Sequence, residues 1–267
     1  LFRSSAASDV YKRQSLEDTG QIDNTIIFMI SDHGEMLGQQ GARGKIVSWE
    51  ESIRVPTLVY HPDLKDKKLC NSVISNIDIV PTLLEFTGLS KSELRDKHPE
   101  LKGNSYAELV ENVNYDNVRD KEGHLIHGVQ IIPTVFEVAE KFRHTALADG
   151  FLAKTKAFMS EGKFLPDFTP PLNYKGVVDK KHKFLRFFSP RQNNIPTNYD
   201  ELTKYNAEYQ LYDLENDPFE MNDLAKDENN RDLLMSMNDK CNTLADKEIG
   251  LENHVIHLPG PDWFWTA

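Results

Sequence analysis

A short apolar run, rich in β-branched residues, extends from Thr25 to Ile30 and is followed almost at once by Asp32, His33 and Gly34. An unbroken run of this length predicts a strand covered on both faces, as in a parallel sheet flanked by helices. In open α/β sheets, ligands collect at the carboxyl ends of the strands. The run therefore predicts an α/β fold in which Asp32 and His33 lie where ligands bind.

A second buried strand is predicted from Val55 to Tyr60, and the loop between the two strands carries Lys45 after glycines at positions 38, 41 and 44. A carboxylate and an imidazole are both common metal ligands. A lysine offers a compact positive charge on a long, mobile stem, which suits an anion. The residues alone leave two interpretations open: a site for a metal and an anion, or a strand-end turn with a hydrogen-bonded histidine and a solvated lysine.

Several segments together resemble the sulfatase family of the alkaline phosphatase superfamily. They are SDHGE at 31–35, the lysine twelve residues beyond the histidine, EESIRVP at 50–56, SNIDIVPTLLEFTGL at 75–89 and LYDLENDPFEMNDLA at 211–225. The resemblance covers most of residues 15–90 and 181–226. It implies a partial alkaline-phosphatase-like α/β sheet flanked by helices, followed by a small α+β carboxy-terminal subdomain with an antiparallel sheet.

The resemblance also implies an activity, the hydrolysis of sulfate monoesters by a metal-assisted formylglycine mechanism. Asp32 and His33 match the family's later pair of metal ligands, and Lys45 matches the catalytic lysine that contacts the sulfate oxygens, with His33 also beside the substrate. The implied cation is calcium, with manganese or zinc as alternatives. The implied substrate is a sulfated small molecule or carbohydrate, and a periplasmic or extracellular location is favoured over a cytoplasmic one.

The family's nucleophile is made from Cys or Ser in a C/S-x-P-x-R motif, and this sequence contains no such motif. Cys70 and Cys241 lie in other contexts and are expected to be buried free thiols. The family's early pair of aspartates has no counterpart in residues 1–23. We therefore expect the formylglycine and the other ligands on a missing amino-terminal part, and this chain alone to be inactive.

Four segments are expected along the chain. Residues 1–14, LFRSSAASDVYKRQ, are predicted to be a non-native leader, with a mature protein processed at this point as the alternative. Residues 15–90 form the end of the catalytic core, 91–180 a variable insertion that shapes the cleft, and 181–267 the carboxy-terminal subdomain.

Local patterns predict individual elements. Pro81 opens a short helix that Gly88 ends, strands lie within 182–190 and 208–217, and residues 230–250 form an amphipathic helix. Asp78 is expected to stabilise the turn before the first of these helices. His124 and His127 are spaced as one helical turn, and we expect solvent-facing or substrate-lining side chains there rather than a second metal site.

Composition limits the partners. The net charge of −11 argues against a nucleic-acid-binding surface, and no apolar run approaches the roughly 20 residues that span a bilayer. Two alternative functions remain. One is a phosphonate monoester or phosphodiester hydrolase of the same superfamily, in which the Asp-His pair and the lysine look the same. The other is a non-catalytic binding protein on this fold, which the joint presence of Asp32, His33 and Lys45 argues against.

Overall fold

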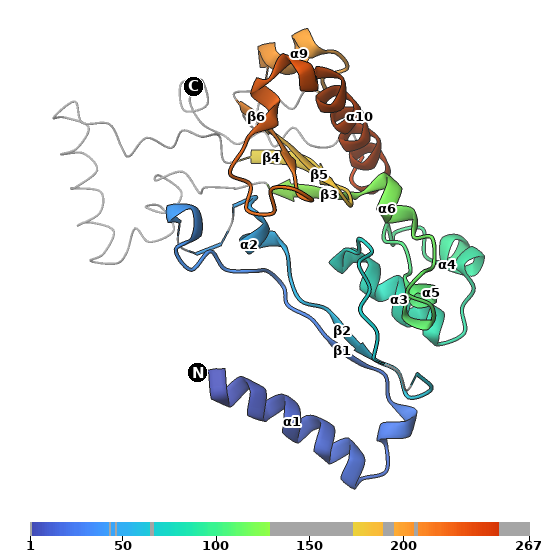
Figure 1. Ribbon diagram of the computed structural model, residues 1–267. Coiled ribbons are helices and arrows are strands. Elements are labelled where there is room, and N and C mark those ends of the chain that lie inside the picture. Colours follow the sequence, from blue (N-terminus) through green and yellow to red (C-terminus); the bar gives the residue numbers. More distant parts are fainter. Residues whose placement is uncertain are drawn as a thin grey trace, which may run out of the picture. The chain divides into compact units, whose positions relative to one another are not determined.

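The computed structural model describes residues 2–42, 44–45, 47–64, 67–128, 173–188, 195–205 and 208–250 (Figure 1). The chain divides into two compact units, residues 1–121 and 122–267. The division falls inside the segment 91–180 that was predicted as an insertion, and residues 129–172 of that segment lie outside the described residues. Helix α1 (Phe2–Asp18) continues through residue 14 without a break. The assignment of residues 1–14 as a leader stays a prediction.

The first unit consists mainly of short elements joined by loops. After α1 come η1 (Ile22–Asn24), β1 (Ile27–Met29), η2 (Gln39–Gly41), α2 (Glu50–Ile53) and β2 (Leu58–Tyr60). The helical part follows, with η3 (Asn76–Asp78), α3 (Ile79–Phe86), α4 (Lys91–Lys97), α5 (Ala107–Glu111) and α6 (Val118–Glu122), whose last residue belongs to the second unit.

Strands β1 and β2 pair with each other in the antiparallel sense, with Ile27 opposite Tyr60 and Met29 opposite Leu58. Within the described residues they form a two-stranded sheet, in which Met29 is 49% and Leu58 61% exposed. The prediction of parallel, fully covered strands is wrong for this pair. Apolar composition is typical of a strand, but strand direction depends on the path of the chain between the strands, which local sequence does not record.

A buried ion pair organises the helical part of the first unit. Arg119 donates from Nε and Nη2 to the Asp78 carboxylate at 2.5 and 2.6 Å, and both side chains are 1% exposed. The same carboxylate accepts the backbone N–H groups of Ser75 and Asn104. The prediction that Asp78 stabilises the turn before α3 is therefore confirmed, and the carboxylate also joins this turn to α6.

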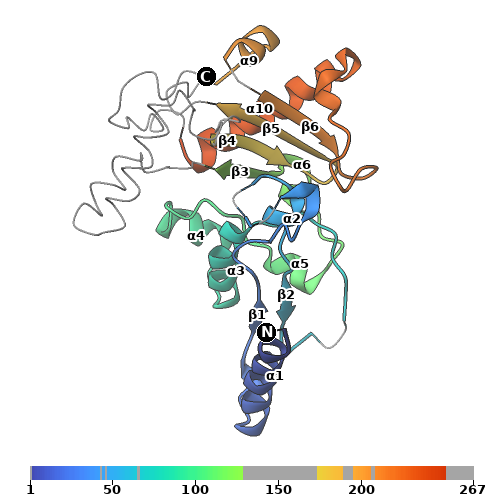
Figure 2. The same cartoon turned by 90° about the vertical axis from the view of Figure 1, so that its left-hand side faces the viewer.

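The second unit is a four-stranded antiparallel sheet covered on one face by a long helix (Figures 1 and 2). The strands are β3 (His124–Gly128), β4 (Asn173–Val178), β5 (His182–Phe188) and β6 (Glu208–Asp213), in that order across the sheet. Helix α9 (Tyr199–Tyr205) precedes β6, and η4 (Leu224–Lys226) and η5 (Glu228–Asn230) lead into α10 (Arg231–Glu248). The core lies between sheet and α10 and includes Val177, Phe184, Leu211, Leu234, Met237, Cys241 and Leu244.

Most of the locally predicted elements are present. Strands β5 and β6 and helix α10 fall inside their predicted ranges, and α3 begins two residues before Pro81. His124 and His127 both lie on strand β3, where residues three apart point to opposite faces, so their spacing is not that of a helical turn. Both cysteines are free, but only Cys241 is buried, so the predicted burial of Cys70 is wrong.

Among the described residues, none of the helices combines the length and the apolar character that a membrane span requires.

Candidate metal and anion site

Asp32 and His33 lie in the turn that follows β1, and local hydrogen bonds fix both side chains. His33 Nδ1 lies 2.7 Å from the carbonyl oxygen of Gly34. Because a carbonyl only accepts, Nδ1 carries the hydrogen, and a neutral His33 presents the lone pair of Nε2 outward. Asp32 Oδ1 accepts the backbone N–H of His33 at 2.9 Å, and Oδ2 lies 3.3 Å from His33 Nε2.

Lys45 reaches the same point from the loop between β1 and β2. Its Nζ lies 2.5 Å from His33 Nε2, so the ammonium group donates into the outward lone pair. The Asp32 side chain is 83% exposed and that of His33 35%. The structure thus brings the three predicted site residues together at a position that an external ligand can reach.

The electrostatics of the cluster favour an ionised aspartate. The hydrogen bond from the backbone N–H of His33 lowers the pKa of Asp32 below its usual value. Slight burial acts in the opposite direction, while the neighbouring His33 and Lys45 add to the lowering. Asp32 is therefore a carboxylate at neutral pH, which is the form that binds a cation.

Gly34 joins this turn to the segment that leads into β2. Its backbone N–H donates to the carbonyl oxygen of Ser52 at 2.7 Å. A Cβ atom added at Gly34 would lie 2.0 Å from the carbonyl oxygen of Glu51, far inside van der Waals contact. Glycine permits this approach because it has no Cβ atom, and the DHG segment therefore lies directly against the EESIRVP segment.

A contact that the sequence did not predict supports the turn from the other side. Asn76 Nδ2 donates to the carbonyl oxygen of Ser31 at 3.1 Å, and Ser31 Oγ donates to the carbonyl oxygen of His33 at 2.8 Å. Asn76 lies in the SNIDIVPT segment, which carries part of the family resemblance, and that position was its only signal. The two bonds tie the ligand-bearing turn to the start of η3.

The geometry of Asp32 and His33 fits part of a metal shell. Bonds of about 2.0–2.6 Å that meet at roughly right angles place neighbouring ligand atoms about 3–3.5 Å apart. The 3.3 Å separation of Asp32 Oδ2 and His33 Nε2 has this size. Among the described residues no cluster of three or more His, Cys, Asp or Glu side chains could hold a metal. Asp32 and His33 are therefore two candidate ligands, and the described residues do not complete a metal shell around them.

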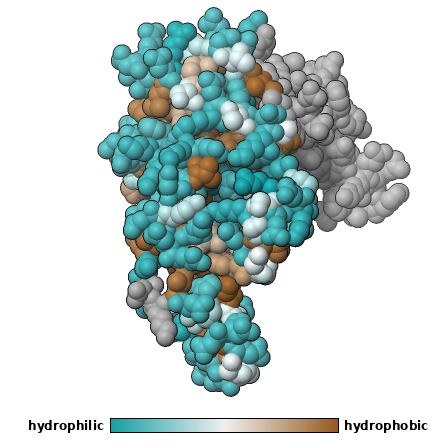
Figure 3. All heavy atoms as spheres, turned by 90° about the vertical axis from the view of Figure 1, so that its right-hand side faces the viewer, coloured by the Kyte–Doolittle hydropathy of each residue, from teal (hydrophilic) through white to brown (hydrophobic). Residues whose placement is uncertain are grey.

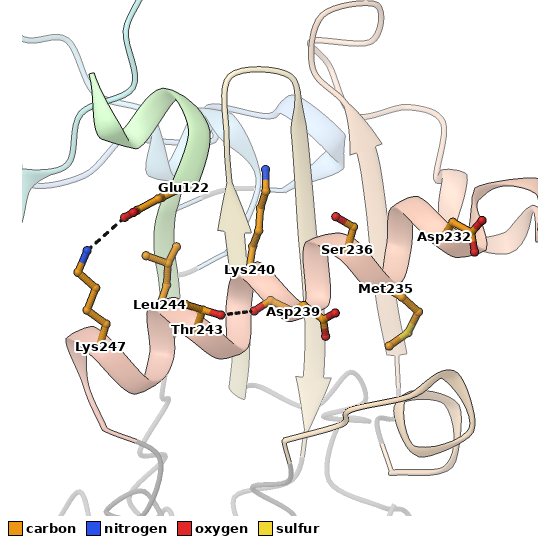
Figure 4. A pocket seen from close by; sticks show the side chains of 9 residues that line it. All are labelled: Glu122, Asp232, Met235, Ser236, Asp239, Lys240, Thr243, Leu244 and Lys247. Atoms are coloured by element: carbon orange, nitrogen blue, oxygen red, sulfur yellow. Dashed lines mark hydrogen bonds and ion pairs between the residues drawn. The ribbon is translucent and has the colours of Figure 1, made fainter. Parts of the chain in front are cut away.

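A groove of about 620 Å³ lies beside α10 in the second unit (Figure 4). It is lined by Glu122, Asp232, Met235, Ser236, Asp239, Lys240, Thr243, Leu244 and Lys247. Lys247 pairs with Glu122 at 3.1 Å, and Lys240 pairs with Asp179 at 2.5 Å. Because both lysines already face a carboxylate, the groove does not concentrate charge of one sign, and we assign it no catalytic role.

Comparison with known proteins gives an independent view of the chain. The family model named Sulfatase matches residues 13–89, which include Asp32, His33 and Lys45. The extracellular sulfatase SULF-1 homolog of Drosophila melanogaster is 38% identical over 82 residues, which are 30% of this chain and 7% of that protein. The chain spans 7% to 20% of the length of the first curated relatives that it matches.

Solved structures extend the likeness beyond the segment that matches by sequence. A protein in complex with its substrate D-glucosamine-2-N,6-O-disulfate superposes with a TM-score of 0.60 at 18% identity, covering 91% of this chain and 39% of that one. The phosphonate monoester hydrolase of Agrobacterium radiobacter gives 0.58 at 21% identity, covering 90% and 38%. These structures confirm the predicted fold class, an alkaline-phosphatase-like architecture followed by a small antiparallel subdomain. Residues 13–89 of this chain thus match the sulfatase family model.

Proposed function

We propose that this chain supplies the Asp32, His33 and Lys45 part of the active site of a sulfate monoester hydrolase. The observation that carries the proposal is the contact of Lys45 Nζ with His33 Nε2 at 2.5 Å, beside the Asp32 carboxylate. A solvated loop lysine would have no reason to converge on these two side chains. The family match over residues 13–89 supports the same conclusion.

Each of the three residues has a distinct role in this proposal. Asp32 and His33 hold a divalent cation, calcium by the family resemblance, which when bound would act as a Lewis acid toward a sulfuryl oxygen. Lys45 turns from His33 toward the sulfuryl oxygens and offsets the negative charge that grows on them. The nucleophile, a formylglycine by the same resemblance, lies outside this chain.

We further propose that the parent protein is longer than this chain. The first unit exposes apolar side chains on β1, on β2 and around α3, namely Met29, Ile30, Leu58, Ile77, Val80 and Leu83. On the face drawn in Figure 3, apolar side chains interrupt an otherwise hydrophilic surface. Apolar surface of this kind favours burial against another structure, which the rest of an alkaline-phosphatase-like sheet would supply.

The substrate class that we propose is a sulfated carbohydrate or small molecule. One structural neighbour is in complex with a disulfated glucosamine. A phosphonate monoester is the second candidate, because a hydrolase of that class superposes with a nearly equal TM-score of 0.58. In the phosphonate alternative the Asp-His pair and the lysine would be the same, with manganese or zinc in place of calcium. The described residues therefore do not favour one reaction over the other, and the family match favours sulfate.

The test is a kinetic comparison on the protein encoded by the complete reading frame. We expect kcat/KM for an aryl sulfate to exceed that for a matched phosphonate monoester. Lys45→Ala should lower kcat for the sulfate by about 10²–10³, and Lys67→Ala, at an exposed lysine of the same unit, should leave it unchanged. Faster turnover of the phosphonate would favour the second candidate. Equal rates for Lys45→Ala and the wild type would refute the role of Lys45.

A further inference from the structure

The side chain of Asn76, in the first unit, bonds to the backbone of a distant segment rather than to its own turn. Its Nδ2 donates to the carbonyl oxygen of Ser31 at 3.1 Å, across 45 positions of the chain. Because a carbonyl oxygen only accepts, the amide nitrogen of Asn76 and not its oxygen faces Ser31. The turn η3 is closed without this amide, since Asp78 Oδ2 accepts the backbone N–H of Ser75 at 2.9 Å. The Asn76 side chain is thus directed at the turn that follows β1.

The turn η3 gives Asn76 a fixed starting point. Its last residue, Asp78, is buried in the ion pair with Arg119. A Cβ atom added at Gly103 would lie 2.0 Å from the carbonyl oxygen of Ile77, so the backbones of these two segments are in direct contact. A shift of η3 would break the ion pair or this backbone contact. Asn76 therefore holds Ser31 from a part of the unit that is itself firmly held.

The carbonyl oxygen that Asn76 holds lies directly before Asp32 in the chain. It belongs to the planar peptide unit that joins Ser31 to Asp32. Fixing this oxygen fixes the rotation of the peptide plane, and that rotation sets the direction in which the Asp32 side chain leaves the backbone. After Asp32, the hydroxyl group of Ser31 donates to the carbonyl oxygen of His33 at 2.8 Å. The hydroxyl bond secures the end of the turn, and the bond from Asn76 secures its beginning.

The effects of this bond on stability and on geometry differ in size. Asn76 is exposed, and a single hydrogen bond that water can replace adds little to the free energy of unfolding. The separation of Asp32 Oδ2 and His33 Nε2, 3.3 Å, changes directly when the peptide plane before Asp32 rotates. Partners that orient metal ligands change the affinity for the metal about 10- to 100-fold. The bond should therefore matter more for cation binding than for folding.

We propose that Asn76 is a positioning residue for Asp32 and His33, the two candidate metal ligands. It acts through the carbonyl oxygen of Ser31 and is not itself a ligand. This role rests on the proposed function, in which the pair holds a divalent cation. It also gives the segment SNIDIVPT, at residues 75–82, a part in the site that its sequence alone does not reveal.

The test is calorimetric titration of the protein encoded by the complete reading frame, stripped of metal with a chelator. Calcium, manganese and zinc chlorides are titrated separately. Asn76→Asp keeps the shape of the side chain and removes the N–H donor, while its added negative charge alone would strengthen cation binding. We expect binding to be weaker instead, by about tenfold or more, with an unchanged urea midpoint in chelator. Asn71→Asp, at an exposed asparagine in the loop before η3, adds the same charge and should not weaken binding.

The outcomes separate this role from the proposed function. Equal cation affinity of Asn76→Asp and the wild type would overturn the positioning role and leave the proposed function intact. A lower urea midpoint of Asn76→Asp in chelator would also overturn it, because the side chain would then support the fold rather than the ligand pair. A wild type that binds none of the three cations would overturn both. Asn76→Gln keeps an amide donor and should bind the cation more tightly than Asn76→Asp.

Discussion

At the scale of single residues, the candidate site depends on a position that carries no functional group. Gly34 lets the backbone of the turn touch the backbone of Glu51 and Ser52, and its carbonyl oxygen fixes the ring of His33. The reactive side chains are therefore positioned by a residue that has no side chain.

Gly34→Ala should disturb both stability and ligand geometry. The new Cβ atom would lie 2.0 Å from the Glu51 carbonyl oxygen, so the two backbone segments must move apart, at a cost of about 2 kcal/mol. Urea denaturation should show the loss. Gly20→Ala is the control, because no atom lies within 4 Å of its added Cβ and only its positive φ of 68° opposes the change. A smaller loss for Gly34→Ala than for Gly20→Ala would contradict this account.

Asp78→Asn should be among the most damaging conservative changes in the first unit. It removes the charge that faces buried Arg119, and an unpaired buried cation costs about 3–5 kcal/mol. The measurement is the urea midpoint of the full chain, with Glu93→Gln in the exposed pair with Lys97 as the control. Comparable midpoints for the two variants would show that the buried pair contributes little.

The sequence allowed the candidate site residues to be selected, but it did not predict the contacts that hold them in place. Asp32, His33 and Lys45 were identified because a family resemblance and a strand-end position agree, and the structure places all three in contact. Asn76 escaped prediction because its contact with Ser31 joins segments 45 residues apart. Such contacts follow from the path of the backbone, which composition and spacing do not specify.

At the scale of elements, prediction succeeded where the pattern is local. Strands β5 and β6 and helix α10 each carry their own apolar pattern. Strand β3 was not predicted, because its two histidines are spaced as on a helical turn. Its pairing partner β4 begins at residue 173, 45 residues after β3 ends at residue 128, so local sequence does not reveal the pairing. The antiparallel pairing of β1 and β2 was missed for the same reason: direction is a property of two strands together.

The turn between β4 and β5 should make the second unit sensitive to acid. Burial raises the pKa of Asp179, but the bond from Lys240 and the backbone N–H groups of Lys181 and His182 outweigh it and lower the pKa overall. A lowered folded-state pKa means that the carboxylate stabilises the fold above the unfolded pKa, near about 3.9. That contribution is lost as the pH falls through the folded-state pKa.

Asp179→Asn should therefore flatten the acid dependence of stability. Urea midpoints of the wild type should fall between about pH 4 and pH 2, and those of Asp179→Asn should start lower at pH 7 and fall less. Asp239→Asn, on the exposed side of α10, serves as the control and should follow the wild type. A wild-type curve with the same slope as the Asp179→Asn curve would exclude the Lys240 contact as the cause.

At the scale of the whole molecule, the surface of the first unit predicts how the isolated chain behaves. Its exposed apolar side chains on β1, β2 and α3 favour association, while the net charge of −11 opposes it. Salt screens the charge but not the apolar surface. The chain should therefore self-associate, and more strongly at high salt.

Sedimentation velocity tests this expectation. The double variant Leu58→Lys with Val80→Lys should shift the weight-average mass toward the monomer, because it places charge on two exposed apolar positions. Leu69→Lys is the matched control, since Leu69 is 84% exposed and lies in a loop outside those elements. A monomeric wild type at high salt, or an equal effect of the control, would remove the support that this surface gives to a longer parent protein.

The hydrogen bond between Gly34 and Ser52 closes the base of the loop that carries Lys45. Inside it, the backbone N–H of Met36 donates to the carbonyl oxygen of Gly44 and closes a second, smaller ring, with the Met36 side chain fully buried. The two ends of the loop are thus held together next to Asp32 and His33, the candidate metal ligands. Insertions or deletions between Gly34 and Ser52 would change how far Lys45 reaches, while Asp32 and His33 would keep their positions. The same scaffold could then accommodate anionic groups at different distances from Asp32 and His33.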